Sequence, residues 1–236
     1  MCIKLSEMIL PARILILFSV FLPSSLLSQT YIKPNYGMKS HETLELIRIE
    51  INPQGTTTYL TLENRITGGY FCTDRRTYII YPDGSRSRMI KASGIPYCPE
   101  LHKFYAVGEK LHFELTFPPL KEGTKWIDLV EQCGSNCYYV YGIVLDNELN
   151  RKIDEVFSAA SSGTPGDNIL LFRRLLEETD SLNLGTEGLL YVNIINAAIE
   201  AGDNVEAAVW YKRLATSGAP RAAEYLKMLN DRGIKF

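Results

Sequence analysis

The cysteines are the residues of this sequence whose type and spacing could most readily do chemistry. Cys133 and Cys137 are separated by three residues in the stretch Cys-Gly-Ser-Asn-Cys. Thiol oxidoreductases normally use two intervening residues at the start of a helix, which lowers the thiol pKa. Here a run typical of a β-strand follows, so the sequence favours a structural bridge. Cys72 and Cys98 lack the close pair spacing of zinc sites, and no metal site is predicted.

The pairing of these cysteines is left open by the sequence. They form an even set once Cys2 of the N-terminal segment is set aside, and an even set in an exported chain favours disulfides. Three pairings are possible for four cysteines. We favour Cys72 with Cys98 and Cys133 with Cys137.

The other candidates for catalysis are scattered along the chain. His41, His102 and His112 are isolated, and the sequence has no Gly-x-Ser-x-Gly elbow and no His-Glu-x-x-His helix. Asp128 and Glu131 lie three apart on one predicted strand, so they point to opposite faces and disfavour a glycosidase pair. We therefore expect these side chains to be surface or solvated groups, and we predict no catalytic residue and no cofactor.

Tyrosine is common, with 14 residues, and several tyrosines cluster on two predicted strands. Their rings suit either the core of a β-sandwich, which we favour, or a recognition surface. Arg75-Arg76 and Arg86-x-Arg88 flank a hairpin and form either a small basic rim or the protection of an edge strand. The candidate binding surface consists of Tyr78, Tyr81, Arg86, Arg88, Tyr138, Trp210 and Tyr211.

The N-terminus has the pattern of a secretory signal peptide. Lys4 and Arg13 supply positive charge, and an apolar run follows over residues 14–22. Leu26 and Ser28 occupy the −3 and −1 positions of a cleavage site before Gln29. The run is short for a bilayer of roughly 30 Å, so cleavage of residues 1–28 is favoured over an uncleaved membrane anchor.

From Leu44 to about Leu145, within a predicted domain of residues 29–146, the sequence alternates with a period of two. Leu111, Phe113, Leu115 and Phe117 alternate with polar residues, and Pro-, Gly- and Asn-rich turns separate similar runs before and after. About seven short strands with this spacing predict an immunoglobulin-like antiparallel sandwich.

The stretch 147–236 has the period of helices. Apolar residues recur at helical spacing in several segments, which Gly202, Gly218 and Gly233 end. Residues 161–166 form the best candidate for a domain linker, and small alanine faces allow close antiparallel packing of an αα-hairpin. The sequence thus predicts an α+β protein of two domains.

One helix pair, residues 191–229, resembles a Sel1-like or tetratricopeptide-type repeat. The resemblance is carried by Gly202, the run Ala-Ala-Val-Trp-Tyr-Lys at 207–212, Gly218, Ala222 and Leu226. A solenoid needs about three units to bury its core, and here there is about one. The resemblance therefore implies a helical cap or docking module.

The front half is similar to immunoglobulin-like domains of exported proteins of the Bacteroidota. The segments 108–120, 127–131 and 141–143 carry this similarity, and the signal that ends at Ser28-Gln29 fits the same origin. The resemblance implies a fold and an exported location, and no reaction.

Charge excludes one class of function. The net charge is −2, so there is no basic excess to neutralise a phosphate backbone, and nucleic acid is not an expected partner. No second apolar run could span a membrane.

We expect a non-enzymatic exported protein of the cell envelope (periplasmic, surface-bound or secreted) that binds a protein partner or acts as an accessory. The alternative is an exported enzyme, thiol-based or hydrolytic.

Overall fold

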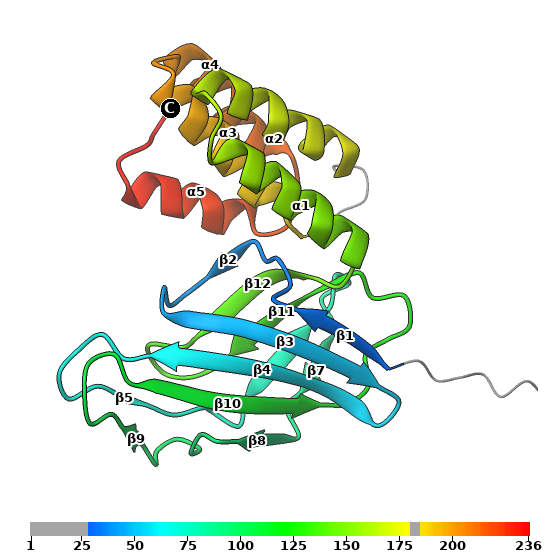
Figure 1. Ribbon diagram of the computed structural model, residues 1–236, viewed down its shortest axis with the longest axis vertical. Helices are drawn as coiled ribbons and strands as arrows, with labels where there is room; N and C mark the ends of the chain where they lie inside the picture. The colour runs from blue at the N-terminus through cyan, green and yellow to red at the C-terminus, as the bar shows by residue number, and fades with distance from the viewer. Residues whose placement is uncertain (1–27, 180–184) are drawn as a thin grey trace, which may run out of the picture.

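The computed structural model describes residues 28–179 and 185–236. The predicted signal peptide, apart from Ser28, lies outside the described residues. The chain is α+β, with antiparallel sheets in its first half and helices in its second, as Figure 1 shows.

Two five-stranded antiparallel sheets form the first half. The first sheet has the order β1 (Gln29–Ile32), β3 (Leu44–Asn52), β4 (Gly55–Glu63), β10 (Lys110–Phe117) and β8 (Lys91–Ser93). The second has the order β2 (Met38–Lys39), β12 (Tyr139–Val144), β11 (Trp126–Glu131), β6 (Thr77–Ile80) and β7 (Arg86–Arg88). A small ladder joins β5 (Tyr70–Phe71) to β9 (His102–Lys103).

The sheets share one apolar core. Along β10 the residues Leu111, Phe113, Leu115 and Phe117 are buried, and the residues between them are exposed or half-buried, which confirms the predicted alternation. They pack in one cluster with side chains of the second sheet such as Ile79 and Leu129. The period of two therefore determines which face of each strand points inward.

Two β-bulges change this alternation locally. One lies in β3 between Leu46 and Arg48, and the other lies in β12, where Tyr141 and Gly142 stand opposite the single residue Asp128 of β11. A bulge adds one residue to one strand of a pair, so the residues beyond it change their relation to the face of the sheet. The bulge in β12 lies opposite Asp128, whose carboxylate accepts from the Gly142 N–H.

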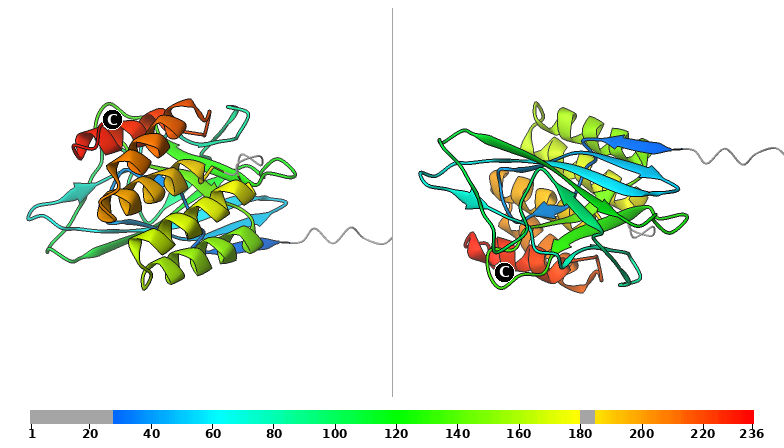
Figure 2. Two further views of the ribbon diagram at one scale, coloured as in Figure 1. Left: turned by 90° about the horizontal axis from the view of Figure 1, so that it is seen from above. Right: turned by 90° about the horizontal axis from the view of Figure 1, so that it is seen from below.

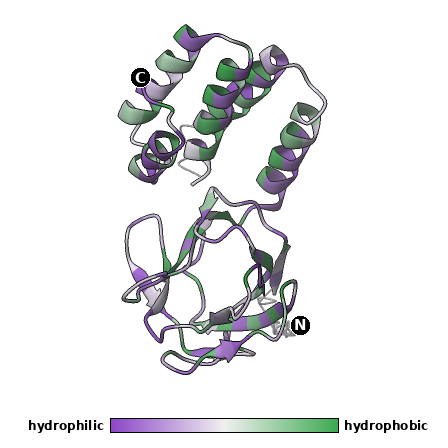
Figure 3. Cartoon of the chain, turned by 90° about the vertical axis from the view of Figure 1, so that its left-hand side faces the viewer, coloured by the Kyte–Doolittle hydropathy of each residue, from purple (hydrophilic) through white to green (hydrophobic). Residues whose placement is uncertain are grey.

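Among the described residues, five helices follow the strands: α1 (Asn147–Ala160), α2 (Pro165–Thr179), α3 (Glu187–Glu200), α4 (Asn204–Thr216) and α5 (Ala222–Asp231). Their apolar side chains form a second cluster, which also contains Val144 of β12, and in it α3 contacts α2, α4 and α5. Figure 3 shows the helices gathered on one side of the strands, and the two views of Figure 2 show them lying across the strands. None of the helices within the described ranges is long and apolar enough to cross a membrane.

The predicted linker at 161–166 is wrong. Leu149 and Ile153 of α1 pack in the same cluster as Phe172 of α2, so this segment is a turn between two helices of one region. The chain passes from strand to helix between Val144 and Asn147, where the Asp146 carboxylate accepts hydrogen bonds from two N–H groups of the first turn of α1.

Polar contacts join the helices to the strands. Arg221, just before α5, bonds Asp128 of β11 through Nε at 3.0 Å, and its guanidinium lies over the ring of Tyr141. At the other end of the junction, the Asn35 N–H donates to Asn150 Oδ1 of α1 at 2.7 Å. The backbones also approach closely: a Cβ on Gly142, which has φ +64°, would lie 2.1 Å from the Gly185 carbonyl oxygen. Glycine is required at this position because any side chain would clash with that carbonyl.

Candidate functional site

Three loops meet at one end of the two sheets, and we call this region the loop end. It comprises residues 64–76 between β4 and β6, residues 94–109 between β8 and β10, and residues 132–138 between β11 and β12. The small β5–β9 ladder joins the first two loops. Cys98 N–H donates to the Thr73 carbonyl at 3.0 Å, and Phe104 N–H donates to the Gly69 carbonyl at 2.9 Å.

Both predicted disulfides form at the loop end. Cys72 pairs with Cys98 and so joins the first loop to the second, and Cys133 pairs with Cys137 within the third loop. The favoured pairing is therefore confirmed. Glu131, Cys133 and Cys137 place ligand-type atoms within 4.8 Å of one another, but both sulfurs are already used in the disulfide.

A buried carboxylate joins the first loop to the third. Glu131 Oε1 accepts from the Asp74 N–H at 2.6 Å, and Oε2 accepts from the Tyr138 N–H at 3.2 Å. Burial raises the pKa of this carboxyl because the charged form loses its hydration. The Tyr138 hydroxyl, in turn, lies 2.8 Å from Thr73 Oγ1, and burial raises the pKa of that phenol.

A pocket of about 500 Å³ opens between the loops. The two disulfides and Glu131 contribute to its wall, and Ile66 and Tyr70 line it while remaining 66% and 64% exposed. Three further large apolar side chains are exposed on the second loop: Leu101, Tyr105 and Val107, with Tyr105 at 96%. Large apolar side chains exposed together on neighbouring loops are typical of an interaction surface.

The predicted binding surface is only partly at the surface. Tyr81, Tyr138 and Trp210 are buried, so their placement on a binding surface is wrong. Tyr138 packs against Phe71 and Phe113 in the sandwich core, and Trp210 packs against Tyr191 among the helices. Burial of a large aromatic ring in a core removes its apolar surface from water and stabilises the fold, which explains these positions.

The remaining members of that surface fall into two places. Tyr78, Arg86 and Arg88 lie together on the paired strands β6 and β7, where Tyr78 is opposite Arg88. Tyr211 is half-buried in α4, where its hydroxyl bonds Asn230 of α5. The structure therefore brings the first three together and leaves Tyr211 with the helices.

Asp128 and Glu131 were expected to be solvated, and this is wrong. Asp128 is 1% exposed and Glu131 is 6% exposed. Asp128 accepts from Gly142 N–H at 2.7 Å and is paired with Arg221, which lies 93 positions away in the chain. Backbone donors and a distant arginine offset the cost of burying these carboxylates, and nothing in the local sequence indicates those partners.

The histidines do not form a catalytic group. His41 is half-buried and its Nδ1 lies 2.7 Å from Ser40 Oγ, while burial lowers its pKa. Within the described parts of the chain, no carboxylate lies in ion-pair distance of His41, so an acid to orient the ring is missing. His102 lies 3.6 Å from Glu109, and His112 is exposed with its Nδ1 2.8 Å from Thr61 Oγ1.

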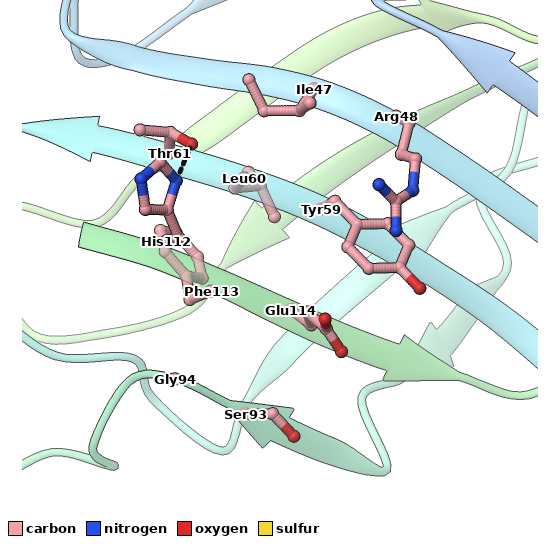
Figure 4. Close-up of a pocket in the computed structure, with 10 residues that line it drawn as sticks. All are labelled: Ile47, Arg48, Tyr59, Leu60, Thr61, Ser93, Gly94, His112, Phe113 and Glu114. Carbon is pink, nitrogen blue, oxygen red and sulfur yellow. Dashed lines mark hydrogen bonds between the residues drawn. The ribbon is translucent and has the colours of Figure 1, made fainter. Parts of the chain in front are cut away.

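A second hollow, of about 360 Å³, lies on the outward face of the first sheet (Figure 4). Strand register places Arg48, Tyr59, Glu114 and Ser93 in one row across it. Its polar groups already bond one another: the Arg48 guanidinium lies over the Tyr59 ring at 3.6 Å, and both side chains bond Glu50. This face is therefore a network of surface pairs, and the loop end is the better candidate site.

Comparison with known proteins gives no relative from which a role could be taken. No family model matches the chain, and neither a curated protein nor a solved structure matches it. The function must therefore be argued from the loop end itself.

Proposed function

We propose that this chain is an exported, non-enzymatic protein of the cell envelope, whose loop end binds a partner protein. The observation that carries the proposal is the group of exposed apolar side chains on loops that the Cys72–Cys98 disulfide and the Glu131 carboxylate hold together. Rigid loops bind at lower entropic cost than mobile ones, because less conformational freedom is lost on association.

A protein fits this surface better than a small molecule. Tyr105 and Tyr70 project outward, with 96% and 64% of their surface exposed, and so they would contact a broad opposing surface. A small ligand would instead be enclosed by its pocket. Tyrosine at such positions provides a large contact area with few rotatable bonds.

The location is part of the same proposal. The disulfides fit an oxidising compartment, and the N-terminal pattern of Lys4, Arg13 and the apolar run supports export by a signal peptide. The resemblance to exported proteins of the Bacteroidota supports the cell envelope as the compartment.

We further propose that the sheets are an immunoglobulin-like sandwich. The orders β3-β4-β10-β8 and β12-β11-β6-β7 agree with the A-B-E-D and G-F-C-C′ sheets of that fold. In this assignment the loop end carries the B–C, D–E and F–G loops, the end at which antibody domains bind antigen. The strands β1 and β2 depart from the pattern, since β2 precedes β3 and pairs antiparallel with β12.

The helix pair α3–α4 with α5 supports the proposal of a Sel1-like docking module. The Trp210 ring is buried against Tyr191, and its Nε1 donates to Glu206 at 2.7 Å. In this proposal the helices serve as a cap on the sandwich, to which Arg221 attaches them.

Site-specific photocrosslinking tests the binding proposal. A photoreactive residue in place of Tyr105 should give one discrete adduct in cells, and the same residue in place of Val205, which is 77% exposed on α4, should not. A Tyr70→Ser change should reduce the adduct at position 105. Equal labelling at both positions, or no intermolecular adduct at either, would contradict the proposal.

The alternative, a thiol-based enzyme, is favoured by one observation. The half-buried Cys133–Cys137 disulfide lies beside the pocket with the Glu131 carboxyl near its sulfurs. An acid in that position could return a proton to a leaving thiolate. The alternative predicts that the Cys133–Cys137 disulfide oxidises a dithiol substrate and is itself reduced, or that the reduced pair reduces a disulfide substrate, and that Glu131→Gln slows this exchange. Our proposal predicts no turnover above that of the Cys133→Ser variant.

A further inference from the structure

A hollow of about 270 Å³ lies beside the loop end, at the edge of the second sheet. It is lined by Arg75, Arg88, Met89, Ile90 and Tyr97. These residues come from the first loop, from β7 and the segment that follows it, and from the second loop. Ile90 is 63% exposed, so the hollow combines two cations with an accessible apolar wall.

The two cations are held in place by specific contacts. The Arg75 guanidinium lies 3.8 Å from the centre of the Tyr97 ring, and the Tyr97 hydroxyl accepts from the Ala92 N–H at 2.7 Å. Arg88 Nε donates to the Arg75 carbonyl at 3.1 Å. An arginine fixed in this way loses less conformational entropy when it binds an anion.

These cations have no carboxylate partner in the described residues. No Asp or Glu oxygen there lies within 4.0 Å of Arg75, Arg86 or Arg88, although many other surface cations are paired. The nearby carboxylates are bonded to other cations: Asp83 bonds Lys121, and Asp74 bonds Arg76, although the charge of Arg88 also helps to lower the Asp74 pKa. Three arginines that share one nearby carboxylate leave an excess of positive charge, which favours the binding of an anion.

Protection of the edge strand β7 does not account for the position of Arg75. Charged side chains on β7 would keep that edge from pairing with another chain, which explains Arg86 and Arg88. Arg75 comes from a different segment, and Tyr97 directs it to the same hollow. Its position therefore calls for a second explanation.

We infer that this hollow binds an acidic side chain of the partner protein, with Arg75 and Arg88 as its two donors. The inference rests on the proposed function and gives that partner a stated chemistry. A carboxylate accepts paired N–H bonds from a guanidinium, and the apolar wall at Ile90 accommodates its apolar neighbours. Phosphate sites usually add backbone N–H groups. Here the N–H groups of Met89, Ile90 and Ala92 already donate to Thr77, Thr116 and Tyr97.

The test measures binding of a fluorescent peptide in which Glu alternates with Leu. The wild-type protein should bind it, added salt should weaken the binding, and the same peptide with Lys in place of Glu should not bind. The double variant Arg75→Gln/Arg88→Gln should bind about tenfold more weakly or worse, as expected for the loss of charge-assisted hydrogen bonds. The matched control Arg173→Gln/Arg174→Gln removes the same charge from α2 and should stay within about twofold of wild type.

Each other outcome has a defined meaning. Absence of wild-type binding, or equal loss in both double variants, would overturn the inference. Displacement of the peptide by low concentrations of inorganic phosphate would show that the hollow is a phosphate site instead. A crosslink at position 105 that persists in Arg75→Gln/Arg88→Gln would leave the proposed function standing without this contact. Peptide binding without any crosslink would support the hollow as a site for acidic side chains and would contradict the proposed function.

Discussion

At the scale of single residues, the structure depends on a few polar groups that are buried. Glu131 and Tyr138 are the clearest pair: the carboxylate accepts the Tyr138 N–H, and the phenol is fully buried in the core. Burial of either group without a hydrogen-bond partner would lower the stability of the fold by about 1–3 kcal/mol. Together with Thr73 and Asp74 they connect the loops that carry the candidate site.

The raised pKa of Glu131 predicts a pH dependence. A group whose pKa is higher in the folded state binds its proton more tightly there, so its contribution to stability is complete at low pH and is lost as pH rises. The loss should begin near the ordinary value of 4.5 and end above the raised pKa of the folded protein. Glu131→Gln cannot ionise and should lack this component.

The measurement is the unfolding free energy of wild type and Glu131→Gln across the acidic range. The difference, wild type minus variant, should fall as pH rises, and other carboxyl groups cancel because both proteins contain them. A difference that is constant with pH would mean that Glu131 titrates normally in the folded protein.

At the scale of elements, the two disulfides hold loops of different length. Cys72 and Cys98 are 26 positions apart, and Cys133 and Cys137 are 4 apart. If a disulfide stabilises mainly by restricting the unfolded chain, replacing the first pair by serine should cost about 3.5 kcal/mol and the second about 2 kcal/mol. Urea titration of the two double-serine variants gives both values. Equal losses, or a larger loss for the short loop, would contradict this order.

The start of α1 offers a second test at this scale. The Asp146 carboxylate accepts from the Leu149 and Glu148 N–H groups, and the bond from Leu149 is the chief cause of its lowered pKa. Asp146→Ala should cost about 1 kcal/mol at neutral pH. Because the folded pKa lies below 3.8, this contribution should disappear as pH falls through the lowered pKa.

The control for that change is Asp203→Ala at the start of α4, a cap with one backbone bond, to Glu206 N–H. Thermal unfolding near neutral pH should show a loss for both variants. A stable Asp146→Ala protein would mean that the transition from strand to helix is fixed by packing alone.

At the scale of the whole molecule, the strands and helices are joined through the Asp128–Arg221 pair. Asp128 is 1% exposed, so Arg221→Gln would leave a buried carboxylate without its cation and should cost about 3 kcal/mol. The double variant Asp128→Asn/Arg221→Gln removes both charges and should recover part of that loss. A double variant no more stable than Arg221→Gln would show that the ion pair does not couple the two regions.

The limits of prediction from sequence follow from the same contacts. The alternation of β10 and the helical period of the second half depend on near neighbours, and the sequence predicted them. The sequence left three cysteine pairings open, and the one that we favoured is the one that forms. The burial of Asp128, Tyr138 and Trp210 depends on partners far along the chain and, for Asp128, on the bulge in β12, which no local pattern marks. The loop end was missed for a similar reason. Tyr70 and the residues Leu101, Tyr105 and Val107 lie on two loops that only the strand order and the Cys72–Cys98 disulfide bring to the same end of the sheets.

Hydrogen–deuterium exchange of the protein, alone and in complex with its crosslinked partner, shows whether the loop end is the binding surface. Binding there should slow exchange in residues 64–76, 94–109 and 132–138, with little change in the helices and on the outward face of the first sheet. Protection confined to the helices, or to the hollow around Tyr59 and His112, would contradict binding at the loop end.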